Sequence, residues 1–139
     1  MKAVVVKTTN EVTIEDLGEP LHMHTQPILG GMIETVHPMR LKRPYLMLVN
    51  ESGLLMDLDI NPLGCYLYGT DTHGAPIVGN IIIMKEVVIN RWGERDIWGL
   101  TDQEAQGFKN LFDELIYRFQ IEEDNDDAEE AKYPQYPVQ

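Results

Sequence analysis

The chain has a single cysteine and no long apolar run. Because Cys65 has no second cysteine to pair with, an internal disulfide is excluded and a cytoplasmic location is expected. The longest apolar run, at residues 81–84, is far shorter than the roughly 20 residues of a membrane-spanning helix. The N-terminus begins with a strand pattern instead of a secretory leader. We therefore expect neither a disulfide-stabilised scaffold nor a membrane protein.

Basic residues are also scarce. The chain has 11 Lys and Arg against 23 Asp and Glu, which gives a formal net charge of -12. The basic residues that could approach a phosphate backbone are Arg40, Lys42, Arg43, Arg91 and Arg95. Affinity for nucleic acid depends on accumulated positive charge, so direct binding of nucleic acid is not expected.

Residues 121–139 are predicted to form an acidic tail. Seven carboxylates lie between positions 122 and 130, and two prolines follow before the chain ends. Such a segment repels itself and has too few apolar residues to pack. We expect a disordered, solubilising tail or, alternatively, an acidic arm that occupies a basic surface on a partner protein.

Residues 1–120 are predicted to form one α+β domain with a mainly antiparallel or mixed β-sheet, a short central helix and one C-terminal amphipathic helix. Residues 20–29 favour a short irregular helix or a loop, because Pro27 interrupts the pattern. A turn at 50–53, with Gly53 at positive φ, is expected to join two strands as a hairpin. The expected strands cover 2–7, 11–16, 32–36, 45–49, 54–58 and 77–86, of which the last should be central and buried on both faces.

Two helices have recognisable starts. Asn61 can cap a short helix that has Pro62 at its first position. Thr101 and Glu104 form a capping box, which predicts the start of the C-terminal helix. We expect this helix to pack on the sheet, and the alternative is an exposed helix that binds a partner. Its apolar residues at helical spacing are Ala105, Phe108, Leu111, Phe112, Leu115, Ile116 and Phe119.

Residues that could perform chemistry are isolated. His22 and His24 could hold a metal together with a residue such as Asp57, Asp59 or His73, but two surface histidines are the favoured interpretation. Cys65 would need a base such as His73 to act as a nucleophile, and an inert thiol is expected instead. The sequence has no phosphate-binding glycine loop, serine elbow or paired-cysteine zinc motif. We expect no catalytic residue, metal or cofactor, and a metal-dependent hydrolase is the least favoured function.

Glycines and asparagines next to the predicted strands are the best candidates for a ligand cleft. Glycine lets backbone amides approach a ligand, and asparagine offers both donors and an acceptor. Turn geometry, a helix cap and close strand packing are the structural alternative for the same residues. The candidate ligand-binding residues are Gly30, Gly31, Glu34, Asn61, Gly79 and Asn80.

The order of these motifs resembles that of domain-of-unknown-function family 3846, small proteins of phages, plasmids and other mobile elements of Firmicutes. The resemblance covers about residues 1–117, and the sequence departs from the family pattern at Pro27, Pro62 and Asn80. The resemblance implies an α+β fold and a mobile-element setting, without any activity. The segments that carry it are Gly30-Gly31, Glu34, Asn50-Glu51-Ser52-Gly53, Asn61, Ile77-Val78-Gly79 and Leu100-Thr101.

These observations favour a non-catalytic function. The first hypothesis is a binding or inhibitory module that acts on a host protein with a basic surface, for example against a host defence system. The alternative is a protein that binds or sequesters a small, nucleotide-like ligand.

Overall fold

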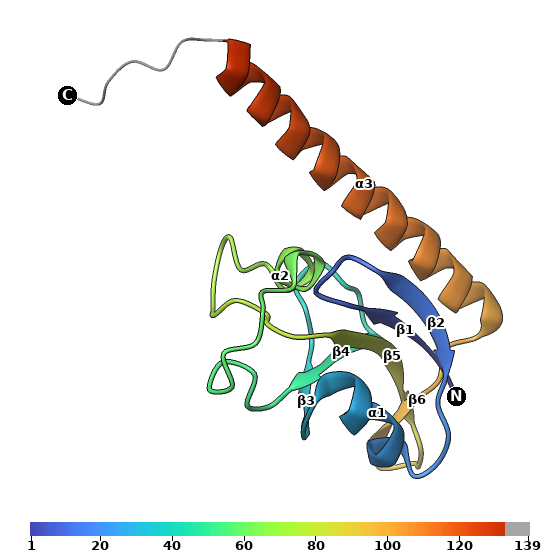
Figure 1. Ribbon diagram of the computed structural model, residues 1–139. Helices are drawn as coiled ribbons and strands as arrows, with labels where there is room; N and C mark the ends of the chain where they lie inside the picture. Colours follow the sequence, from blue (N-terminus) through green and yellow to red (C-terminus); the bar gives the residue numbers. More distant parts are fainter. Residues whose placement is uncertain (133–139) are drawn as a thin grey trace.

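The computed structural model describes residues 1–132 and the side chains of residues 1–124. One six-stranded sheet has the strand order β2-β1-β5-β4-β3, and β6 also pairs with β5 (Figure 1). The predicted α+β class is confirmed, and the strand pairs are all antiparallel among the described residues. The elements are β1 (Lys2–Val6), β2 (Val12–Asp16), α1 (Leu21–Leu29), β3 (Ile33–Val36), β4 (Tyr45–Asn50), α2 (Pro62–Tyr68), β5 (Ile81–Val88), β6 (Arg95–Trp98) and α3 (Asp102–Lys132).

The central strand is β5, as predicted. Its first half pairs with β1 on one side and β4 on the other, and its second half pairs with β6. Ile81, Ile82 and Ile83 are fully buried, as expected for a strand covered on both faces. The strand begins four positions later than predicted, because Gly79 has a φ of 79° and interrupts the extended backbone.

Helices cover the two faces of the sheet (Figure 1). On one face α3 and α2 enclose a core that contains the fully buried Phe112. On the other face α1 places Leu29 against Leu46 and Leu48 of β4. The amphipathic packing predicted for the C-terminal helix is therefore confirmed, and Leu111 is the residue of its apolar stripe that stays exposed.

The capping box at the start of α3 is confirmed. The backbone N–H of Glu104 donates to Thr101 Oγ1 at 3.1 Å, and Glu104 Oε1 accepts from the Thr101 N–H at 2.8 Å. Glu104 also accepts hydrogen bonds from Lys85 of β5 and Tyr45 of β4. One side chain thus attaches the N-terminus of α3 to the central strand β5 and to its neighbour β4.

The predicted boundary at residue 120 falls inside α3, which continues to Lys132. Glutamate and alanine are good helix formers and are frequent in residues 121–132, which favours a helical backbone in this segment. The far end of α3 projects beyond the sheet in Figure 1. The rest of the predicted tail, residues 133–139, lies outside the described residues. Within residues 1–132, no helix is both long and apolar enough to cross a membrane.

The hairpin predicted for residues 45–58 is wrong. β4 pairs with β3 and β5, so neither of its edges is free for residues 54–58. Residues 51–57 form consecutive turns instead, in which Asn50 Oδ1 accepts from the Ser52 N–H at 2.8 Å. Asp57, and not Gly53, adopts the positive φ, at 54°. The short strand β6 was not predicted, because a four-residue run with two charges lacks a clear alternating pattern.

Candidate functional site

The six predicted ligand-binding residues do not form one site. Gly30, Gly79 and Asn80 line a hollow of about 270 Å³ beside the C-terminal end of α1. Glu34 lines a separate, larger cleft of about 620 Å³. Gly31 and Asn61 line neither of the two. The run of glycine and asparagine motifs is therefore divided between two surfaces and the interior.

Asn61 has a structural role in the interior. Its side chain is fully buried, and Oδ1 accepts from the Gly64 N–H at 2.9 Å, which is the predicted helix cap. Its Nδ2 donates to the carbonyl oxygens of Val6 and Gly79, both at 3.0 Å. Asn61 therefore joins α2 to β1 and to the segment before β5.

Asn80 and Gly31 also contribute to packing. Asn80 Oδ1 accepts from the Thr8 N–H at 3.2 Å, and its Nδ2 donates to the Ile28 carbonyl at 3.0 Å. A Cβ on Gly31 would lie 3.0 Å from Nδ2 of Asn50, so the site has little room for a side chain. These contacts agree with the alternative that Asn80 and Gly31 serve packing and not ligand binding. A ligand-binding role for the six residues stays a prediction.

Asn50 is a further buried asparagine that sequence reasoning did not select. Its Nδ2 donates to the Leu29 carbonyl at 3.0 Å, and it holds the turn after β4 against the end of α1. The signal was present, since an asparagine followed by Ser52 and Gly53 is typical of a side-chain-stabilised turn. Asn50 also lines the larger cleft.

The larger cleft is the best-formed candidate site. Its volume of about 620 Å³ lies within the range of about 300–1,000 Å³ typical of ligand pockets. Strand β3 and the end of β4 form one wall, and the turn after β4, the end of α2 and the segment before β5 form the rest. The lining residues are Glu34, Thr35, Val36, His37, Val49, Asn50, Glu51, Gly53, Leu54, Leu55, Tyr68, Ala75, Pro76, Ile77 and Val78.

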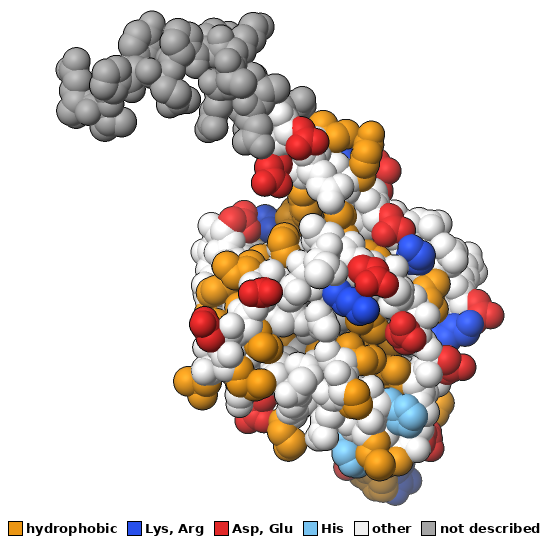
Figure 2. All heavy atoms as spheres, in the orientation of Figure 1, with side chains coloured by type: hydrophobic (Ala, Val, Ile, Leu, Met, Phe, Trp, Pro, Cys, Tyr) orange, Lys and Arg blue, Asp and Glu red, His pale blue; other side chains and the backbone are white. Residues whose placement is uncertain are grey.

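Large apolar side chains stand exposed at the rim of this cleft. Leu55 is 92% exposed and Leu54 is 57% exposed, and Met56, which follows them in the chain, is 50% exposed. Figure 2 shows hydrophobic side chains at the margin of the molecule where Figure 1 places the turns after β4. An exposed apolar cluster beside a cleft is typical of an interaction site. Sequence reasoning missed this rim because it assigned residues 54–58 to a strand.

The charged groups of the cleft are mainly acidic. Glu34 and Glu51 lie in its wall, and none of the described lining residues is lysine or arginine. Neither carboxylate forms an ion pair with a side chain that the structure describes. The cleft therefore suits a ligand that carries positive charge.

His37, directly after β3, contacts a charged group formed by Glu86 and Arg95. Its Nε2 lies 3.0 Å from Oε1 of Glu86, and Arg95 reaches the same oxygen at 3.3 Å. Burial acts to raise the pKa of Glu86, but the hydrogen bonds and charges of His37 and Arg95 outweigh it and lower that pKa. Glu86 therefore holds His37 and β6 together at one end of the cleft wall.

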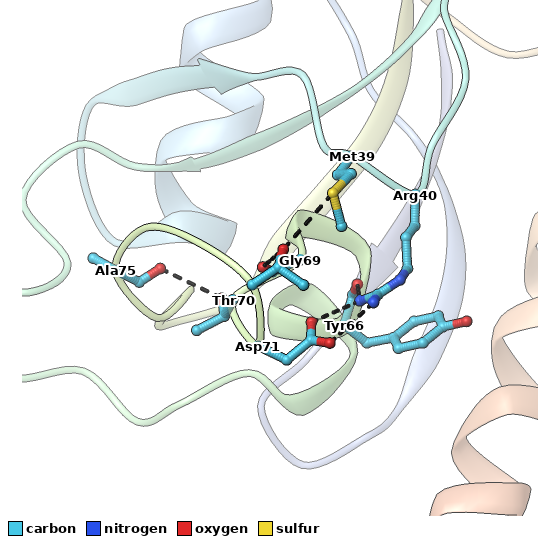
Figure 3. A network of polar contacts seen from close by, with 8 residues as sticks. Met39, Arg40, Tyr66, Gly69, Thr70, Asp71 and Ala75 are labelled. Carbon is cyan, nitrogen blue, oxygen red and sulfur yellow. Dashed lines mark hydrogen bonds and ion pairs between the residues drawn. The ribbon is translucent and has the colours of Figure 1, made fainter.

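A polar network holds the segment that leads from α2 to residues 75–78 of the cleft wall (Figure 3). Arg40 donates to both carboxylate oxygens of Asp71, at 2.9 and 3.0 Å, and to the Tyr66 carbonyl at 2.7 Å. The hydrogen bonds from Arg40 lower the pKa of Asp71. The arginine also lies over the Tyr66 ring, 4.7 Å from its centroid. Residues 71–74 form a turn, and the bidentate ion pair between Arg40 and Asp71 fixes its start.

The candidates for nucleophilic or metal chemistry either make packing contacts or lie exposed on the surface. The thiol of Cys65 contacts the backbone of Ile77, and His73 packs against the ring of Tyr68. His22 and His24 lie exposed on α1. In the part of the chain that the structure describes, no group of three or more His, Cys, Asp or Glu residues is placed to hold a metal ion.

Comparison with known proteins gives one result. No curated protein and no solved structure matches the chain. The model of the family described as Domain of unknown function (DUF3846) matches residues 1–113, which include all six strands, both shorter helices and every residue of the cleft. The resemblance noted in the sequence is thereby confirmed, and the chain belongs to this family.

Proposed function

We propose that the protein is a non-catalytic binding module that holds a segment of a partner protein in the cleft beside β3. The observation that carries the proposal is the exposed pair Leu54 and Leu55 at the rim of a cleft of about 620 Å³. Burying one leucine side chain contributes about 1.5–3 kcal/mol to the free energy of binding. A partner that covers both leucines would therefore gain much of its binding free energy from this rim.

The partner is expected to present a basic surface. Glu34 and Glu51 in the cleft and the formal net charge of -12 both favour positively charged groups. A partner of this kind agrees with an inhibitory module that acts on a host protein. That role, the counter-defence role and the mobile-element setting remain predictions.

The test compares two leucines that differ in position. Leu55→Glu changes the rim of the cleft, and Leu111→Glu makes the same chemical change at an exposed site on α3. Partner proteins captured from host lysate by the unmodified chain should stay bound to Leu111→Glu. They should bind Leu55→Glu at least about tenfold more weakly, because a carboxylate replaces the exposed apolar contact. Equal capture by the two variants would contradict the proposal.

Removal of residues 122–139 tests the acidic segment separately. The segment carries seven carboxylates and one lysine, so its loss should reduce the long-range attraction of a basic partner. We expect the association rate at low salt to fall on the order of tenfold, with little change in the dissociation rate. Surface plasmon resonance at two salt concentrations measures both rates. Equal association rates for the full and shortened chains at low salt would exclude a role for the segment.

A small ligand is the second candidate function. It is favoured by one observation, since three of the six predicted residues, Gly30, Gly79 and Asn80, do line a common hollow. Against it, both ends of the Asn80 amide already have backbone partners. A thermal-shift screen with nucleotides tests this alternative, and the absence of stabilisation by all of them would count against it.

A further inference from the structure

The outer side of β3 has backbone groups free for pairing. The Glu51 N–H donates to the Met32 carbonyl at 2.9 Å, so these two residues form a hydrogen-bonded pair of the antiparallel ladder. Such pairs alternate along a ladder, which makes Glu34 with Val49 the next one. The N–H and C=O groups of Ile33 and Thr35 therefore point away from β4. On that side β3 pairs with no strand of the described residues.

The cleft lies where a strand added to β3 would place its side chains. Glu34 and Val36 line the cleft and share one face of the sheet, because side chains alternate along a strand. Alternate side chains of an added strand would lie about 5 Å from them on that same face. One such side chain would face the carboxylate of Glu34, and the next would face Val36.

We propose that the cleft receives an extended segment of a partner protein, which adds to the free edge of β3 as a further strand. Main-chain hydrogen bonds from Ile33 and Thr35 hold the segment, and its side chains select it. A lysine or arginine pairs with Glu34, and an apolar residue two positions away packs against Val36 in the cleft. This inference rests on the proposed function and specifies the partner of the same cleft.

A second copy of the chain is a poorer occupant. A charged side chain on an edge strand disfavours pairing with a second copy of the same strand, and β3 carries one such residue, Glu34. Two β3 strands paired with each other would bring two unpaired carboxylates close together, which is destabilising. The same carboxylate favours a segment with a basic side chain.

The first experiment uses fluorescent peptides as probes. A peptide with the sequence Thr-Lys-Thr-Val-Thr-Lys-Thr, blocked at both ends, places lysine and valine on one face and reads the same in both directions. It should bind with measurable anisotropy change, and the matched Thr-Glu-Thr-Val-Thr-Glu-Thr peptide should bind at least about tenfold more weakly. Undetectable binding of the lysine peptide, or equal binding of the two peptides, would overturn the inference.

Methylation of peptide nitrogens tests the strand pairing directly. In an added antiparallel strand the N–H groups of the threonines face β3, whereas in a parallel strand those of lysine and valine do. N-methylation of one set should therefore abolish binding, while N-methylation of the other set leaves it within about twofold. If both methylated peptides bind as well as the unmodified one, or if both fail, the strand arrangement is wrong.

Variants of β3 separate this inference from the proposed function. Thr35→Pro removes an outward N–H and leaves the pairs with β4 intact, and Thr35→Ala is its matched control. We expect Thr35→Pro to bind the lysine peptide about tenfold more weakly than the unmodified chain does, and Thr35→Ala to bind it within about twofold. If Leu55→Glu loses the partner and Thr35→Pro keeps it, the cleft binds a partner without strand addition. Self-association that Thr35→Pro abolishes would identify a second copy as the occupant and overturn the inference.

Discussion

Replacement of Asn61 by alanine is expected to lower the free energy of unfolding by about 3–5 kcal/mol. The side chain is fully buried and makes three hydrogen bonds, to the Val6 and Gly79 carbonyls and from the Gly64 N–H. Alanine would leave two buried acceptors and one helix N-terminal donor without partners. Each such group costs about 1–3 kcal/mol, and water cannot replace the amide easily in a fully buried position.

Urea unfolding followed by circular dichroism measures this effect. Asn110→Ala is the matched control, because Asn110 is exposed on α3 and alanine is the better helix former. The control should stay within about 0.5 kcal/mol of the unmodified chain. A loss below about 1 kcal/mol for Asn61→Ala, together with a changed ligand or partner affinity, would instead support the ligand-binding role predicted from the sequence.

Asn61 illustrates what local sequence can and cannot specify. The helix cap follows from an asparagine directly before a proline, and the structure confirms it. The two bonds from Nδ2 reach a residue 55 positions away and another 18 positions away. No local pattern contains such contacts, because they depend on which strands the tertiary fold brings beside α2.

The exposed rim of the cleft is a second feature that local sequence does not specify. Leu54, Leu55 and Met56 form an apolar run directly after a turn-like segment, so the sequence alone favours pairing them with the strand before them. That pairing is impossible in the fold, since β3 and β5 already occupy both edges of β4. The apolar run is left exposed at the rim, and only the sheet order, which the sequence does not specify, makes this visible.

Other elements were predictable because their signals are local and strong. The capping box at Thr101 and the apolar spacing behind it define the start of α3 and its buried face. The continuous apolar run of β5 indicates a central strand. Strand β6 is four residues long and its side chains are mostly exposed, so burial imposes no pattern on it.

The second large effect is a dependence of stability on pH through Glu104. Its pKa falls from 4.5 to about 2, although burial acts in the opposite direction, because hydrogen bonds from Lys85, Tyr45 and Thr101 favour the carboxylate. The folded-state pKa is depressed, so the stabilisation is complete above pH 4.5 and is lost as the pH falls through about 2. The difference corresponds to a stabilisation of at most about 3 kcal/mol at neutral pH.

Glu104→Gln removes this titration while keeping the size of the side chain. We expect the free energy of unfolding of the variant to be about 2–3 kcal/mol lower than that of the unmodified chain at pH 7. This difference should shrink steadily as the pH falls from about 4.5 to about 2.

Glu114→Gln is the control, because Glu114 lies 57% exposed on α3 and its ion pair with Arg118 is a surface contact worth at most about 0.5 kcal/mol. Urea unfolding of the three chains at several pH values measures the differences. A constant difference for Glu104→Gln across this pH range would mean that the side chain stabilises α3 through shape alone. The link from Lys85 and Tyr45 to the helix N-terminus would then not depend on its charge.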